Sequence, residues 1–350
     1  MTDTDGGRPA RTKRATIVDV ARHAGVSTAS ASKVLRNAYG VSDAMKERVQ
    51  ASMEALEYRP HRPARGMRGR TYTVGMMVSD IDNPYFSLIA DGLASVLRPS
   101  DYELLVSPGG YDAASQNQAI EALIDHQMDG LILVAPLVSP ADLERVSGEI
   151  PVVVVGSHTA SPSVDSVSGD DQLGSRLVVD HLVALGHRRI GFVANHQVAA
   201  ESHRPESVRL AGFLEAMAQH DLSDEAVVID TQWSLEGGRD AVRLIDALDN
   251  PPSAVFAGAD ITALGMMSEL WEGSRSAPDA YSLAGYDNSR IASIGPIGLT
   301  TVDQSGHEVG ASAGRLLLER IGGRGEASHL LLRPELVVRT TTAPPTPRAL

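Results

Sequence analysis

The chain has 350 residues, a formal net charge of −13 at pH 7 and a hydrophobic content of 43%, which suits a globular protein of two or three domains. It contains no cysteine, which excludes disulfide bonds, thiolate metal sites and a cysteine nucleophile. The sequence contains no run of about 18 apolar residues, so it predicts no membrane-spanning helix.

The charge is divided unevenly along the chain. The first 70 residues carry 14 Lys and Arg against 7 Asp and Glu, whereas the remainder carries 17 against 37. A small basic module on a larger acidic body favours contact between that module and a polyanion; a basic patch on an ordinary surface helix is the alternative. Residues 1–14 are polar and lack the apolar core of a signal peptide, so we expect a disordered basic N-terminus on a cytoplasmic protein.

Three short helices are predicted in the basic segment. Thr16 is a good N-cap, and Asp19 three residues later can complete a capping box for a helix that ends before Gly25. Ser27 can cap a second helix over residues 28–36. A third is expected over residues 42–58. The predicted buried positions of the last two helices are Ala31, Val34, Leu35, Met45, Val49, Met53 and Leu56.

Two short helices joined by a tight glycine turn and followed by a third form a helix-turn-helix arrangement. The second helix, TASASKVLR, has compact outward side chains, which let a recognition helix enter the major groove and reach base edges. The alternative is a three-helix cap whose small residues only allow close packing.

The stretches TIVDVARHAGVSTASASKVLRN and VSDAMKERVQASMEALEYRP closely resemble the N-terminal signature of the lactose repressor/galactose repressor family of bacterial transcription regulators. Two departures occur, because Ser30 and Ala31 replace the usual Thr-Val pair and Lys33 replaces the usual Arg. Since Lys lacks the rigid guanidinium fork, base choice at Lys33 stays open. The resemblance implies a DNA-binding domain over residues 15–60 and DNA contacts by Thr16, Ser27, Thr28, Ala29, Ser30, Ser32, Lys33, Arg36, Tyr58, His61, Arg62, Ala64 and Met67.

The segment HRPARGMRGR is a basic linker that contains Pro and Gly, and a solvated linker is its simplest reading. In the family it resembles, the matching segment forms a hinge helix on operator DNA, beside its dimer mate, and inserts an apolar wedge into the minor groove. Met67 occupies the wedge position here, with Ala64 as its helical neighbour. Because Pro and Gly make this a poor helix by itself, we expect the hinge, residues 61–71, to be ordered by DNA and the second subunit.

From residue 72 onward, short apolar runs alternate with amphipathic helices such as residues 84–97 and 113–126. This alternation predicts an α/β fold with parallel sheets covered by helices on both faces. The runs are TVGMMVSD, YELLVSPG, GLILVAP, PVVVVGS, SVSGDD, RIGFVAN, AVVID, AVFAGAD and YSLAGYD.

Two lobes are expected from these units. The first comprises residues 72–170 and 301–332, the second residues 171–300 and 333–340, and residues 341–350 form a disordered tail. The landmarks DIDNPYF, DHQMDGLIL, LVALGHRRIGFV, RLAGF, GADITALGMM and AGYDNS occur in the order found in the two-lobed, periplasmic-binding-protein-like (type I) effector domain of the same family. The resemblance therefore covers nearly the whole chain, although a true periplasmic binding protein is disfavoured without an export signal.

Ligands of open α/β sheets bind beyond the carboxyl ends of the strands, which predicts a pocket between the lobes. By motif, the resemblance implies that Tyr85 and Phe86 border the effector while Arg209 and Asp287 hydrogen-bond it. Trp233 offers an aromatic face for a sugar ring, although a partly buried core aromatic is an equal alternative. The expected effector contacts are Asp80, Tyr85, Phe86, Ser107, Pro136, His158, Arg209, Trp233, Asp260 and Asp287.

Two positions depart from common usage in the family. Ala259 stands where many relatives have Asn or Ser, and Gly156 stands where many sugar-binding members have Asp. Each change removes a polar contact, which favours a ligand less rich in hydroxyl groups than a simple hexose. His158, Arg204 and Arg209 together suit a carboxylate or a phosphate as the alternative.

Common nucleophile, zinc and phosphate-loop motifs are absent from the sequence, so we expect no enzyme activity, no cofactor and no metal. The predicted function is a ligand-responsive, sequence-specific DNA-binding transcription regulator. It would be a repressor of a sugar-uptake or catabolic operon, released by a sugar, sugar acid or sugar derivative, and would bind a pseudo-palindromic operator in the nucleoid as a homodimer. The alternative is a cytoplasmic α/β sugar-sensing or enzymatic protein whose basic module reads no operator. The sign of the effector's action, and dimer against tetramer, stay open.

Overall fold

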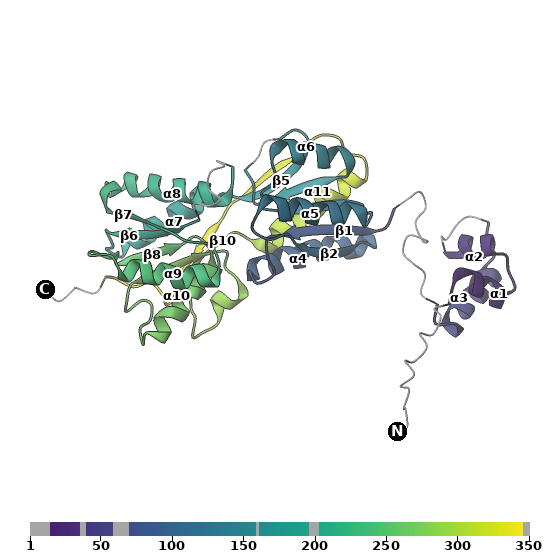
Figure 1. Cartoon of the computed structure of the whole chain (residues 1–350), viewed down its shortest axis with the longest axis horizontal. Coiled ribbons are helices and arrows are strands. Elements are labelled where there is room, and N and C mark those ends of the chain that lie inside the picture. Colours follow the sequence, from purple (N-terminus) through teal and green to yellow (C-terminus); the bar gives the residue numbers. More distant parts are fainter. Residues whose placement is uncertain (1–14, 36–39, 59–69, 159–160, 196–202, 346–350) are drawn as a thin grey trace, which may run out of the picture. The chain divides into compact units, whose positions relative to one another are not determined.

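The computed structural model describes residues 15–35, 40–58, 70–158, 161–195 and 203–345 (Figure 1). It divides into two compact units, Met1–Tyr72 and Thr73–Leu350. Among the predicted DNA contacts, Arg36, His61, Arg62, Ala64 and Met67 lie outside the described residues, as do the N-terminal tail, nearly all of the hinge and the last five residues. No helix among the described residues is long and apolar enough to cross a bilayer.

The first unit contains three helices: α1 (Ile17–Ala24), α2 (Thr28–Leu35) and α3 (Asp43–Ala55). The predicted capping box is present, since the Thr16 hydroxyl accepts a hydrogen bond from the Asp19 amide and the Asp19 carboxylate accepts one from the Thr16 amide. Gly25 ends α1 in the left-handed conformation that glycine favours. Val20, Ala31 and Val49, one from each helix, are fully buried and form the centre of a small core.

Two details of this unit differ from the prediction. Helix α3 ends at Ala55 and not near residue 58, because the chain turns left-handed at Glu57 and the Tyr58 amide bonds back to the Met53 carbonyl. On α2 only Ala31 is fully buried, whereas Val34 and Leu35 are half-buried. A helix of about two turns is too short to bury a wide apolar face.

We expect Thr16→Ala to lower the free energy of unfolding of the N-terminal unit by about 1 kcal/mol, because it removes the side-chain half of the capping box. Ser42→Ala is the matched control, since Ser42 occupies the N-cap of α3 but makes no side-chain capping bond. Chemical denaturation followed by circular dichroism measures both changes. Equal losses would show that the capping box does not hold α1.

The first lobe of the second unit is built on a six-stranded, parallel sheet in the order β11-β5-β4-β3-β1-β2. Its strands are β1 (Thr73–Val78), β2 (Glu103–Pro108), β3 (Gly130–Val134), β4 (Val152–Val155), β5 (Asp165–Gly169) and β11 (His329–Leu332). Its helices are α4 (Pro84–Leu97), the 3₁₀ turn η2 (Arg98–Ser100), α5 (Ala113–Asp125), α6 (Pro140–Glu149) and α11 (Gly306–Ile321). Residues of α5 and α6 share one core cluster with β1, β3 and β4.

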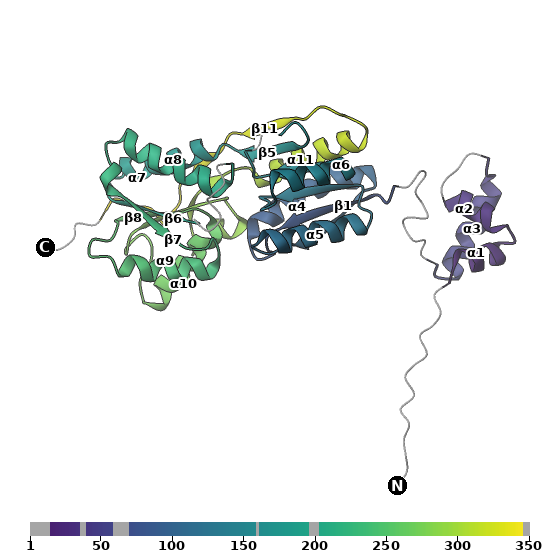
Figure 2. The ribbon, with the colours of Figure 1, turned by 45° about the horizontal axis from the view of Figure 1, so that its top comes forward.

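The second lobe contains a sheet in the order β12-β10-β9-β8-β6-β7, in which only the β10–β12 pair is antiparallel. Its strands are β6 (Ile190–Ala194), β7 (Ala226–Asp230), β8 (Ala254–Ala257), β9 (Ser282–Tyr286), β10 (Thr300–Asp303) and β12 (Glu335–Val337). The helical segments are α7 (Asp171–Ala184), α8 (Pro205–Gln219), η3 (Ser223–Glu225), α9 (Leu235–Asp246), α10 (Asp260–Glu272) and η4 (Arg290–Ser293). Helices α7 and α8 cover one face of the sheet, and α9 and α10 the other (Figure 2).

The chain passes between the lobes after β5, after β10 and after β11. The expected return to the first lobe at residue 301 comes slightly later, because β10 pairs with β9 and β12 of the second sheet. Helix α11 then packs along α4 of the first lobe, where Gly92 and Gly310 allow close backbone contact. These crossings place the carboxyl ends of both parallel sheets opposite each other.

Candidate functional site

Helix α2 presents a thin, polar outer surface. Thr28, Ala29 and Lys33 are exposed. The Ser27 hydroxyl accepts a hydrogen bond from the Ser30 amide at 3.1 Å and lies 2.9 Å from the Ser30 hydroxyl. Lys33 has no ion-pair partner among the residues that the structure describes. Its ammonium group is therefore free to meet an anion.

The side chains of Thr16, Ser32 and Tyr58, three further DNA-contact candidates of this unit, have contacts within the protein. The Thr16 hydroxyl also donates to the Asp19 carboxylate at 2.7 Å, so its capping role is satisfied within the helix. Ser32 is half-buried, and Tyr58 packs against the three-helix core. The structure therefore brings Thr28, Ala29 and Lys33 together on one exposed surface, while part of the Tyr58 side chain belongs to the core.

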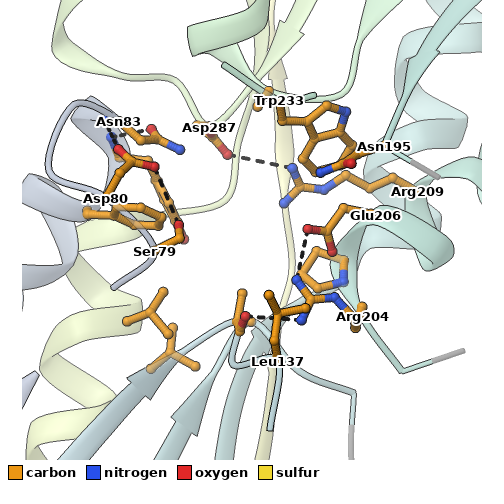
Figure 3. A pocket seen from close by; sticks show the side chains of 18 of the residues that line it. Ser79, Asp80, Asn83, Leu137, Asn195, Arg204, Glu206, Arg209, Trp233 and Asp287 are labelled. Atoms are coloured by element: carbon orange, nitrogen blue, oxygen red, sulfur yellow. Dashed lines mark hydrogen bonds and ion pairs between the residues drawn. The ribbon is translucent and has the colours of Figure 1, made fainter. Parts of the chain in front are cut away.

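A cavity of about 470 Å³ lies within the second unit, between the carboxyl ends of its two sheets (Figure 3). Ser79, Asp80 and Asn83 line it from the first lobe, and Arg209 and Trp233 line it from the second. This volume is in the range of pockets that enclose a small organic ligand. The cavity lies beyond the carboxyl ends of the strands, as the sequence predicted.

Six of the expected effector contacts line this cavity: Asp80, Tyr85, Phe86, Arg209, Trp233 and Asp287. Asp80 is held in place because its Oδ1 accepts the Asp82 and Asn83 amides, each at 2.8 Å, and its Oδ2 accepts the Tyr111 hydroxyl. These hydrogen bonds fix the orientation of the Asp80 carboxylate on the first-lobe side of the cavity.

The remaining four expected contacts do not line the cavity. Ser107 lies inside β2, and the loop beyond that strand supplies Tyr111 and Asp112 in its place. Pro136 contributes its carbonyl to the Arg204 guanidinium at 2.9 Å, while its neighbours Ala135 and Leu137 line the cavity. The carboxyl end of a strand predicts which loop borders the cavity, but it does not predict which residue of that loop points inward.

His158 and Asp260 have partners within the protein. His158 Nε2 lies 2.8 Å from Asp171 Oδ2. Asp260 is fully buried, and it accepts the Thr301 hydroxyl at 2.6 Å and the Ser289 amide at 2.7 Å. Burial raises the pKa of Asp260 to about 6, even though these hydrogen bonds favour its ionised form. Both residues support the cavity from behind its lining.

Arg209 is the centre of the second-lobe side. Its Nε donates to Asp171 Oδ1 at 2.7 Å and its Nη1 to the Gly258 carbonyl at 2.7 Å. The guanidinium also stacks 3.7 Å from the centre of the Tyr286 ring and lies 3.8 Å from Asp287 Oδ1. Burial alone would lower the pKa of Arg209, but the neighbouring carboxylates outweigh it and raise that pKa. Arg209 is therefore charged and rigidly positioned.

The two carboxylates beside Arg209 differ in their electrostatics. Burial opposes ionisation of Asp171, yet the charge of Arg209 and the hydrogen bond with His158 hold its pKa below the ordinary value. Burial raises the pKa of Asp287 well above the ordinary value, and Arg209 only partly offsets that effect. The Gln304 amide donates to Asp287 Oδ1 at 2.6 Å. Asp171 therefore neutralises Arg209, which leaves Asp287 as the polar group for a ligand.

Trp233 serves the core and the cavity at once. Its indole nitrogen donates to the Val193 carbonyl at 3.0 Å, and its ring packs against the second-lobe core. A side chain on Gly258 would lie 2.0 Å from the ring, so that glycine makes room for it. Trp233 nevertheless lines the cavity beside Arg209, whose guanidinium lies 5.2 Å from the ring centre. The two readings of Trp233 from the sequence are therefore compatible.

Glu206 and Gln116 are lining residues that were missed from the sequence, whereas Asn195 begins a loop that was expected at the pocket. Glu206 lies in the first turn of α8, and its Oε1 accepts from Arg204 Nη2 at 3.0 Å. Asn195 follows β6, and Gln116 lies on α5, where its side chain bonds the Gly110 carbonyl and the Leu137 amide. The strand-end rule pointed to the loop of Asn195, but the residues on helices carry no such signal. Among the described residues, no group of three or more His, Asp or Glu side chains is placed to hold a metal ion.

Comparison with known proteins identifies both units. Residues 16–61 match the family of bacterial regulatory proteins, lacI family, and residues 179–342 match the periplasmic binding protein-like domain. The chain is 32% identical over 337 residues to the HTH-type transcriptional repressor PurR of Vibrio campbellii, covering 93% of this chain and 98% of that protein.

Two solved structures show the same architecture. The lac repressor dimer bound to operator and the anti-inducer ONPF superposes with a TM-score of 0.78 and 27% identity, over 95% of this chain and all of that one. The transcriptional regulator CelR in complex with cellobiose gives a TM-score of 0.67 and 28% identity, over 94% of this chain and all of that one.

Proposed function

We propose a specific function from the premise that this chain belongs to the lacI family of bacterial regulatory proteins. It is an effector-responsive, DNA-binding transcriptional repressor and not an enzyme. The proposal is that it represses an operon for sugar uptake or catabolism, and that a sugar or sugar derivative bound in the cavity releases it from a pseudo-palindromic operator. As a regulator of genes it would act in the cytoplasm, at the nucleoid.

Operator reading is assigned to the exposed surface of α2. Thr28 and Ala29 are small enough to let the helix approach base edges, and Lys33 can contact guanine or phosphate. Two such helices, one from each subunit of a homodimer, would read the two half-sites. The edge strand β2 supports a dimer, because Leu105 and Val106 on it are 48% and 47% exposed and offer apolar surface to a second copy.

The observation that carries the sugar assignment is the group formed by Arg209, Trp233 and Asp287 in one cavity. An aromatic face packs on the C–H groups of a sugar ring, while a fixed guanidinium and a carboxyl group bond its hydroxyls. The similar CelR structure contains cellobiose. A carboxylate or phosphate ligand is less favoured, because Arg209 pairs with Asp171 and Arg204 pairs with Glu206 already.

The function is tested by capturing genomic DNA fragments on the full-length protein and sequencing those that bind. Binding to the captured operator should weaken by about 1,000-fold or more between roughly 50 and 200 mM salt, because basic side chains release counterions from phosphates. Lys33→Ala should weaken operator binding by about 10-fold, since it removes a groove contact. Lys46→Ala on α3 is the matched control, because Lys46 is paired with Asp43. Binding that ignores salt, or equal loss in both variants, would contradict this contact surface.

A further inference from the structure

Three buried polar atoms on the second-lobe side of the cavity have no hydrogen-bond partner among the residues that the structure describes. They are Asn195 Oδ1, Arg204 Nε and Glu206 Oε2, and all three residues line the cavity while being less than a tenth exposed. A buried polar group without a partner destabilises a folded protein, and each such group calls for an explanation. Their position at the cavity indicates that a ligand provides the missing partners.

The charges of the cavity restrict the ligand's chemistry. The acidic residues that line it outnumber the basic ones, Arg204 and Arg209. They are Asp80, Asp112, Asp171, Glu206 and Asp287. Each arginine already faces a carboxylate of the protein, and two of the three unpartnered atoms are acceptors. A fitting ligand therefore brings hydrogen-bond donors and no negative charge.

Arg204 connects this side of the cavity to the opposite lobe. It is the N-cap residue of α8 in the second lobe, yet its Nη1 donates to the Pro136 carbonyl at 2.9 Å and to the Ala135 carbonyl at 3.3 Å in the first lobe. Its Nη2 donates to Glu206 Oε1. Figure 3 shows Glu206 between Arg204 and Arg209 at the edge of the open space. One carboxylate thus adjoins both the cavity and the contact between lobes.

We propose that Glu206 determines effector specificity by accepting a hydroxyl or amino group of the ligand at Oε2, with Asn195 accepting a neighbouring donor. Through Oε1 and Arg204, the same carboxylate conveys occupancy of the cavity to the first lobe. The ligand class is a neutral or amino-bearing polyhydroxyl compound with at least two donors on the edge that faces this side. The inference rests on the proposed function, because it takes the cavity as the effector site.

The chain offers a clean optical test, because it has only two tryptophans. Trp271 is 79% exposed, so Trp271→Phe leaves Trp233 as a reporter inside the cavity. In this background we expect cellobiose, ribose or glucosamine to change the fluorescence, and gluconate and glucose 6-phosphate not to do so. Glu206→Gln should weaken binding of a responding probe by about 10- to 100-fold, as expected for loss of a hydrogen bond to a charged group.

The matched control is Glu236→Gln, because Glu236 lies in the first turn of α9 but outside the cavity. This variant should bind the probe as the parent protein does. Asn195→Ala leaves the Arg204–Glu206 pair intact and should also weaken the responding probe, so it keeps the test decisive if the Glu206→Gln protein does not fold.

Communication between the lobes needs a separate measurement. The chain contains no cysteine, so Gln118→Cys on α5 and Asp249→Cys in the second lobe allow specific fluorescent labelling. A responding probe should change energy transfer between the labels. Arg204→Met should abolish that change at saturating probe, whereas a residue with only a structural role would shift the melting temperature and leave the change in place.

The outcomes divide clearly. The proposal is overturned if Glu206→Gln binds the probe like the parent, if the anionic probes bind in preference, or if no neutral or amino sugar of the panel binds. It is also overturned if energy transfer in the Arg204→Met protein responds as in the parent. None of these results affects capture of operator DNA by the probe-free protein, which tests the proposed function independently.

Discussion

Replacing Arg209 with alanine is expected to lower the free energy of unfolding of the second unit by about 3–5 kcal/mol, because it leaves the buried, ionised Asp171 without its counter-charge. Asp171 would lose a 2.7 Å ion pair, and Asp287 would lose its nearest positive charge. The Gly258 carbonyl and the Tyr286 ring would also lose their contacts with the guanidinium. Urea denaturation monitored by circular dichroism measures the loss.

The matched control for this change is Arg243→Ala on α9. Arg243 also pairs with two carboxylates, Asp240 and Glu269, but its side chain is 59% exposed. Exposed ion pairs contribute about 0–1 kcal/mol, so this variant should unfold almost like the parent protein. Similar losses for the two variants would mean that the arrangement around Arg209 has no special energetic role. Arg209→Lys should recover part of the stability but not the effector affinity, because it keeps the charge without the fork.

The second large effect is expected from Gly92→Ala, at the packing contact between α4 and α11. A Cβ atom on Gly92 would lie 2.0 Å from the His307 carbonyl oxygen and 2.8 Å from the Ala311 amide nitrogen, both on the backbone of α11. Backbone atoms within a packed helix have little freedom to move away, so the helices must separate. We expect a loss of about 1–3 kcal/mol or more in thermal unfolding experiments.

Gly148→Ala provides the control for the glycine substitution. Gly148 lies inside α6, and a Cβ atom there would meet no other atom within 4 Å. Alanine is the better helix former by about 0.5–1 kcal/mol, so this variant should be as stable as the parent or more stable. If Gly92→Ala unfolded at the same temperature as the parent, the close approach of α4 and α11 would not hold the first lobe together.

The sequence predicted those elements that local interactions specify. The α1 capping box depends on residues three apart, and α4 starts at Pro84 and ends at Leu97 as its apolar pattern indicated. The strands β1 to β9 were recognised as apolar runs, whereas β10, β11 and β12 were not predicted as strands. The family followed from a basic segment whose motif is nearly contiguous, and it is confirmed by the comparisons.

Errors arose where distant residues decide the outcome. The predicted boundary between the lobes at residue 301 falls inside β10. This strand pairs with β9 and β12 of the second sheet, and the pairing with β12 joins segments that are far apart in the sequence. Asp260 was expected in the cavity but is satisfied by Ser289 and Thr301. The strand-end rule gives the neighbourhood of a site, but it does not say how each side chain turns.

The sequence alone thus determined the architecture, the regulator family and the surface of α2, because helix periodicity, capping and short motifs are encoded by neighbouring residues. Only the tertiary structure decided the lining of the cavity. Glu206 pairs with Arg204, its neighbour two residues earlier, but only the fold brings the Arg204 guanidinium to the carbonyl of Pro136 in the first lobe. The place of Glu206 at the cavity depends on lining residues from segments distant in the chain, which no local sequence pattern specifies.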